Sequence, residues 1–104
     1  MSSFLSRKRE PMTLKEWAVA YENADNRQVA LDENVVPGVT VSTIWEGIVT
    51  PLRGIFESVA IVDGEIHWDT AIHSDTEEEA YAAHAKLVDR AKNGGYPWVR
   101  KTSS

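Results

Sequence analysis

The 104-residue chain contains no cysteine. This absence excludes a disulfide scaffold, a thiolate zinc site, an iron–sulfur centre and a cysteine nucleophile. Long apolar runs are also missing, because no stretch approaches the roughly 18 consecutive apolar residues that a membrane-spanning helix requires. Residues 1–9 lack the apolar segment of a signal peptide. We therefore expect a cytoplasmic protein with no membrane partner.

Glycines are few and scattered, and the adjacent pair Gly94 and Gly95 follows a predicted helix instead of preceding one. A phosphate-binding loop needs clustered glycines before a helix, so the sequence holds no nucleotide-binding fingerprint. No serine lies in a G-x-S-x-G motif, which leaves serine hydrolysis without support. The sequence predicts a non-enzymatic protein without a cofactor.

Charges of the two signs are separated along the chain. All sixteen carboxylates lie within residues 10–91, against five basic side chains, whereas residues 1–9 and 92–104 carry three basic side chains each. Basic termini can reach a phosphate backbone, but the acidic body would repel a duplex, so nucleic acid is an unfavoured partner. We expect a flexible basic arm at 1–12, a single domain at 13–95 and a basic tail at 96–104.

Two segments have the periodicity and the start signals of helices. Thr13 and Glu16 form a capping box before an apolar stripe that ends near residue 23. Thr76 and Glu79 form a second box, and glycines at 94–95 end that helix. The expected inner stripe of the second helix consists of Ala80, Ala83, His84, Leu87, Val88 and Ala91.

The residues between the helices have the pattern of short strands separated by turn residues. The expected strands are 27–31, 39–47, 55–62 and 66–72, with a turn at 32–38, a loop at 48–54 and a hairpin turn at 63–64. Alternation places Ile66 and Ile72 on one face of the last strand, and His67 and His73 on the other. The order predicts an α+β two-layer sandwich. In it, an antiparallel meander of three or four strands is flanked in sequence by an N-terminal and a C-terminal helix, both packed on one sheet face.

The strand at 55–62 is apolar on both faces, so helices on one face leave apolar side chains on the other. Ile55, Val59 and Ile61 are therefore the expected interface of a two-fold homodimer. The alternative is that residues 96–99 and the N-terminal arm fold over this face.

Candidate ligand-binding side chains lie on adjacent predicted strands and in the loop between them. Glu46 and Glu57 form a carboxylate pair, for which a solvated sheet edge is the simpler interpretation. Stacking on Trp45 and Trp68, together with the Arg53 guanidinium, could hold a base and a phosphate.

The three histidines do not form a predicted metal site. His84 has side chains that cannot bind a metal at the neighbouring helical positions, so we expect it to face the sheet as a hydrogen-bonded residue. His67 and Asp69 favour a surface salt bridge over an acid–base pair, although they are the best catalytic candidates in the chain. His73 lies six residues after His67, too far along a strand to join it.

Four segments together resemble a known family. They are MTLKEW at 12–17, VTVSTIWEG at 39–47, IFES at 55–58 and TEEEA at 76–80, which is followed by His84. This combination is similar to small uncharacterised proteins encoded by phages of actinobacteria, over about residues 12–91 of the chain. The resemblance implies a phage protein acting in the host cell, and it carries over no catalytic residue.

Three functional hypotheses follow. The first is a non-enzymatic phage accessory protein that binds proteins, with itself as a homodimer and with a host or phage protein as a further partner. The second is a protein that sequesters a small nucleotide-type ligand as a counter-defence factor. The third is nucleic-acid binding through the basic termini.

Overall fold

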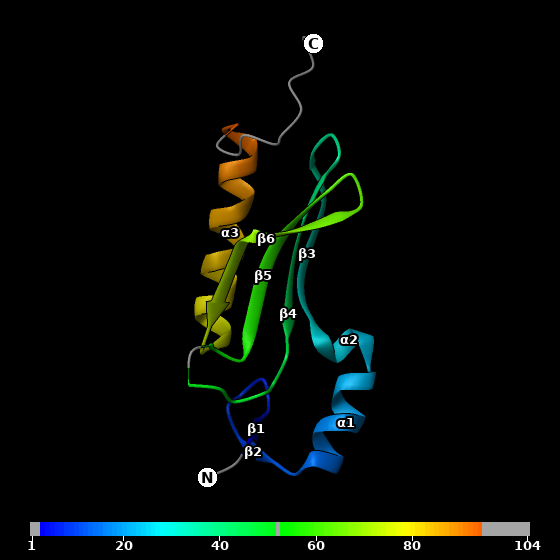
Figure 1. Ribbon diagram of the computed structural model, residues 1–104, viewed down its shortest axis with the longest axis vertical. Coiled ribbons are helices and arrows are strands. Elements are labelled where there is room, and N and C mark those ends of the chain that lie inside the picture. Colours follow the sequence, from blue (N-terminus) through cyan, green and yellow to red (C-terminus); the bar gives the residue numbers. More distant parts are fainter. Residues whose placement is uncertain (1–2, 52, 95–104) are drawn as a thin grey trace.

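The fold is α+β, and the computed structural model describes residues 3–51 and 53–94 (Figure 1). The predicted tail at 96–104, including the fold-back at 96–99, lies outside these residues. The helices and strands are, in chain order, β1 (Phe4–Leu5), β2 (Pro11–Met12), α1 (Leu14–Glu22), α2 (Ala24–Arg27), β3 (Gln28–Val36), β4 (Val39–Trp45), β5 (Phe56–Val62), β6 (Glu65–Ser74) and α3 (Glu77–Lys92).

Both predicted capping boxes are confirmed. The Thr13 hydroxyl accepts the Glu16 N–H at 3.1 Å, and the Glu16 carboxylate accepts the Thr13 N–H at 2.8 Å. The hydrogen bond from the Thr13 N–H, and after it one from the Thr13 side chain, lower the pKa of the Glu16 carboxyl. Thr76 and Glu79 form the same reciprocal pair at the start of α3. The short helix α2 was not expected, and it begins because the Asn23 side chain accepts two backbone N–H groups.

Strands β3 to β6 form the predicted antiparallel meander, in the spatial order β3-β4-β5-β6. Asp63 and Gly64 both have positive φ, at 50° and 83°, as a type I′ hairpin turn requires. One boundary prediction was wrong, because residues 32–36 belong to β3 and the turn is confined to 37–38. The residues that predicted a turn form a bulge within β3, in which Asn34 has a left-handed backbone conformation (φ 51°).

A larger bulge interrupts β6. Its pairing with β5 runs from Ala60↔His67 directly to Ser58↔Ile72, so three extra residues lie between. The Thr70 hydroxyl fills the gap, accepting the Ala60 N–H at 2.9 Å and donating to the His67 carbonyl at 2.6 Å. The predicted alternation is therefore wrong: Ile66 pairs with Ile61 on one face, whereas Ile72 pairs with Ser58 on the other.

Helix α3 packs along one face of the sheet, which we call the covered face (Figure 1). Leu87 of α3 is fully buried there against Val39 and Val41. The covered face consists of Val39, Val41, Thr43 and Trp45 of β4 and Phe56, Ser58, Ala60 and Val62 of β5.

Helix α1 does not share that layer, contrary to the prediction that both helices pack on one face. It lies beyond the end of the sheet at which Trp45 stands (Figure 1). The aromatic side chains explain this position: Trp17 stacks on Tyr21, and its indole N–H donates to the Glu46 carbonyl at 2.8 Å. These contacts hold α1 at the strand end, where the Tyr21 ring also meets Trp45.

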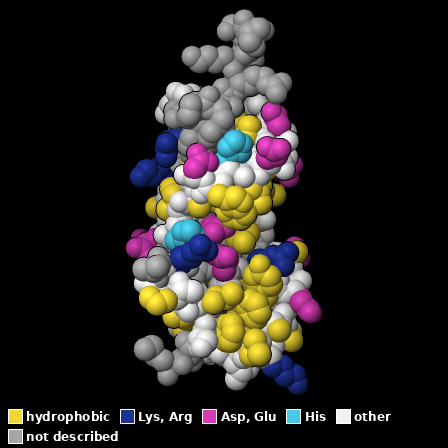
Figure 2. Space-filling view, viewed as in Figure 1, with side chains coloured by type: hydrophobic (Ala, Val, Ile, Leu, Met, Phe, Trp, Pro, Cys, Tyr) yellow, Lys and Arg dark blue, Asp and Glu magenta, His cyan; other side chains and the backbone are white. Residues whose placement is uncertain are grey.

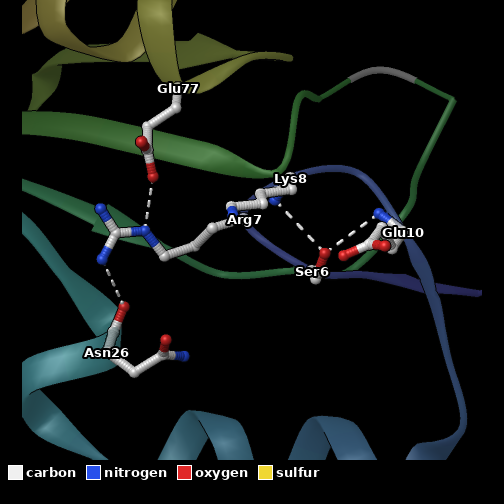
Figure 3. Close-up of a pocket in the computed structure, with 6 residues that line it drawn as sticks. All are labelled: Ser6, Arg7, Lys8, Glu10, Asn26 and Glu77. Carbon is white, nitrogen blue, oxygen red and sulfur yellow. Dashed lines mark hydrogen bonds and ion pairs between the residues drawn. The ribbon is translucent and has the colours of Figure 1, made fainter.

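Within the segment predicted as a flexible arm, β1 and β2 pair as a two-stranded ribbon that docks on the domain. The Leu5 carbonyl accepts the Trp45 indole N–H at 2.9 Å. The Arg7 guanidinium donates to the Glu77 carboxylate at 2.6 Å and to the Asn26 carbonyl at 3.0 Å (Figure 3). Arg7 thus crosses an open depression of about 520 Å³ between the ribbon, α2 and the start of α3. Within the described residues, no helix has the length and apolarity needed to span a bilayer.

Candidate functional site

The sheet face opposite α3, which we call the open face, combines apolar and polar side chains. Ile66 is 45% exposed and Leu31 is 47% exposed, and Ile44 and Ile61 are partly exposed. By strand register the open face consists of Gln28, Leu31, Thr40, Ser42, Ile44, Glu57, Val59, Ile61, Ile66 and His73. In the view of Figure 2, hydrophobic areas lie on either side of a group of charged side chains and a histidine.

At one end of the open face, Glu46, Glu57 and His73 form a carboxylate–histidine cluster. The His73 Nε2 atom lies 2.9 Å from Glu57 Oε2, and one ligand atom from each of the three residues lies within 4.8 Å of the others. Glu57 is only 7% exposed, and the His73 side chain is 25% exposed. The three side chains come from β5, β6 and the residue after β4.

Strand register brings Glu57 and His73 together. Ile44, Glu57 and His73 are direct partners across β4, β5 and β6, so their side chains lie side by side on the open face. Without the bulge in β6, Glu57 would pair with Thr70, three residues earlier.

A second irregularity holds Glu46 at the end of β4. The N–H groups of Glu46 and Gly47 both donate to the Ile55 carbonyl, at 2.7 and 3.1 Å. Gly47 has a φ of 74°, and a Cβ atom there would lie 2.5 Å from the Trp45 ring, so the position requires glycine. Glu46 therefore follows Ile44 on the open face, while the Trp45 side chain enters the core.

The electrostatics of the cluster are unbalanced. Burial raises the pKa of the Glu46 carboxyl, and the nearby negative charge of Glu57 raises it further. His73 and Arg53 oppose this rise in the pKa of Glu46. Two carboxylates thus share a partly desolvated site whose positive neighbours do not cancel their repulsion.

A small cavity of about 90 Å³ lies beside Glu46, the only one of the three cluster residues that lines it. Thr50, Arg53 and Gly54 line it from the loop between β4 and β5, together with Ile48. Arg53 is exposed and lines this cavity together with Glu46, so a cationic side chain lies near one carboxylate of the cluster.

The structure brings together three of the five predicted ligand-binding residues: Glu46, Glu57 and Arg53. Trp45 is fully buried on the covered face, where no ligand can stack on it. The reason is geometric, because consecutive strand residues point to opposite faces. Trp68 is 63% exposed in the β6 bulge and does not line the cavity.

The three predicted interface residues differ in how far the structure exposes them. Ile55 is 2% exposed and packs in the core with Trp45 and Phe56, so it is unavailable to a partner. Val59 is 7% exposed, and Ile61 is partly exposed on the open face.

His84 faces the sheet, as predicted, within a buried hydrogen-bond chain. Its Nε2 lies 2.7 Å from Asp32 Oδ2 and its Nδ1 lies 2.8 Å from Thr43 Oγ1, which lies 2.6 Å from Ser58 Oγ. This order resembles the relay that activates a hydroxyl nucleophile. Thr43 and Ser58 are 0% exposed, so no substrate can reach them, and the chain satisfies polar groups within the core.

His67 and Asp69, the best catalytic candidates from the sequence, are a loose pair, with His67 Nδ1 and Asp69 Oδ1 3.9 Å apart. His73 was missed as a site residue because its position depends on the bulge in β6.

Comparison with known proteins gave no matching family model, no matching curated protein and no matching solved structure.

Proposed function

We propose that the protein is a non-enzymatic phage accessory protein that acts by binding, and that a second copy of the chain docks on the open face. The observation that carries this proposal is an uncharged, partly exposed apolar area on an otherwise acidic protein. The phage assignment is supported by the resemblance of the segments at 12–17, 39–47, 55–58 and 76–80.

The charge distribution favours a second copy as the occupant. Two cross-strand rows, Leu31–Ser42–Val59 and Thr40–Ile61–Ile66, contain no charged side chain. Copies of a chain with a net charge of -5 repel one another, and this repulsion is smallest where the meeting surfaces are uncharged. A two-fold arrangement buries the same apolar patch twice and leaves no charge unpaired in these rows.

The size of the face sets the expected affinity. Four strands about 4.8 Å apart, with seven residues at about 3.4 Å each, give an area of roughly 450 Å² per copy. Two copies would bury on the order of 900 Å², below the roughly 1,200 Å² at which standard interfaces begin. We therefore expect a reversible dimer in the micromolar range.

Oligomeric state tests this proposal directly. Native mass spectrometry and light scattering of the full chain, from low to high micromolar concentration, should show a monomer–dimer equilibrium. Ile66→Glu should raise the dissociation constant at least about tenfold, because each copy would bury an unpaired carboxylate.

Val19→Glu is the matched control, since Val19 is 66% exposed on α1, away from the open face. It should leave the equilibrium unchanged. A wild-type chain that remains monomeric throughout, or an equal effect of the two variants, would overturn the proposal.

A further inference from the structure

The carboxylate–histidine cluster has the composition and spacing of a metal-binding site. Ligands about 2.1 Å from a divalent ion lie roughly 3.0–3.4 Å apart when they are neighbours in octahedral or tetrahedral coordination. The 2.9 Å separation of His73 Nε2 and Glu57 Oε2 is already close to this spacing. The third ligand atom, from Glu46, lies within 4.8 Å and needs only a small side-chain movement.

Two further observations point to a cation. The Glu57 side chain is 8% exposed, and its carboxylate lies against His73, with a ligand atom of Glu46 also nearby. The cavity beside Glu46 has a volume of about 90 Å³, enough for about three waters at roughly 30 Å³ each. Water in this cavity could therefore reach an ion from the Glu46 side.

We propose that Glu46, Glu57 and His73 bind one divalent transition-metal ion, which ties β5 and β6 to the end of β4. The ion replaces the repulsion between the two carboxylates by attraction to a shared positive charge. This inference does not depend on the homodimer, because all three ligands belong to one chain.

The ligand set selects the class of ion. An imidazole nitrogen with two carboxylates suits zinc, manganese or ferrous iron, whereas calcium and magnesium prefer all-oxygen sites. Zn²⁺ binds both imidazole and carboxylate readily, so it is the first probe, and Mn²⁺ is the second.

The test is isothermal titration of the metal-stripped full chain with Zn²⁺ and, in parallel, electron paramagnetic resonance with Mn²⁺. We expect one ion per chain, and an increase in Tm on adding Zn²⁺. Zn²⁺ affinity should fall in acid solution, because protons compete with the metal for its ligands.

Three variants remove the ligands one at a time. Glu57→Gln, His73→Ala and Glu46→Gln should each weaken Zn²⁺ binding by at least about tenfold. Glu46→Gln changes a half-buried side chain at the end of the sheet. Circular dichroism of each metal-free variant establishes that it is folded.

The matched control uses the other histidine–carboxylate pair on β6. His67→Gln and Asp69→Asn remove the same chemical groups and should leave Zn²⁺ affinity unchanged. Retained affinity in a folded His73→Ala or Glu46→Gln variant, loss of affinity in the control pair, or no binding of Zn²⁺ to the wild type would each overturn the site.

Ile66→Glu separates the two proposals. It should weaken dimerisation at least about tenfold and still bind one ion per chain. A monomeric wild type that binds Zn²⁺ through the cluster would overturn the homodimer alone, and a dimer without metal binding would overturn the metal site alone.

Discussion

The two faces of the sheet differ in how their apolar side chains are buried and where their polar and charged side chains lie. The covered face buries its apolar side chains under α3 and satisfies its polar ones internally, through His84, Thr43 and Ser58. The open face leaves Leu31 and Ile66 about half exposed and concentrates charge in one cluster at its end. We therefore expect the covered face to contribute most of the folding stability, and we propose that the open face is the one that binds.

The largest expected effect comes from breaking the covered face at its centre. Leu87→Ala should reduce the free energy of unfolding by about 3 kcal/mol, because it removes a fully buried side chain and leaves a cavity. Urea denaturation of the metal-free monomer measures the change. Ile66→Ala is the open-face counterpart and should cost less than about 1 kcal/mol. Equal losses would refute the division of roles between the two faces.

A smaller effect tests the polar part of the comparison within a single strand. Thr43→Val keeps the shape of the side chain but breaks the hydrogen bonds to His84 and Ser58, so it should cost roughly 1–3 kcal/mol. Thr40→Val makes the same change on the open face and should alter stability by less than about 0.5 kcal/mol. Thermal unfolding of the two variants side by side gives the answer, and a costlier Thr40→Val would contradict it.

The smallest expected effect is that of the Glu46 charge, on the open face, on the stability of the protein. Because the folded-state pKa of Glu46 is raised above its ordinary value of 4.5, ionisation of this carboxyl costs stability as the pH rises through the folded pKa. Glu46→Gln should therefore raise the Tm of the metal-free protein at neutral pH by about 1–2 °C, in line with a partly exposed charge interaction.

This gain should disappear below pH 4.5, where the carboxyl is protonated in both the folded and the unfolded chain. Differential scanning calorimetry at several pH values measures it. A gain that persists at low pH would show that the change acts through packing and not through charge.

Most of the fold could be predicted from signals that lie within a few residues of one another in the sequence. The capping boxes at Thr13 and Thr76, the Asp63–Gly64 turn and the alternation of β4 each act within a few residues, so they could be predicted from the sequence. The docked ribbon β1–β2 could not, because Arg7 finds its partner Glu77 seventy positions further along the chain.

The candidate site, too, could be predicted from the sequence only in part. From the sequence, strand alternation and turn residues could place Glu46 at the end of one strand and Glu57 on the next strand of an antiparallel meander. The position of His73 beside them depends on the tertiary structure, because the β6 bulge shifts the pairing by three residues. The bulge is held by a hydrogen bond from the backbone of β5 to the Thr70 side chain, a contact between strands that no local pattern specifies.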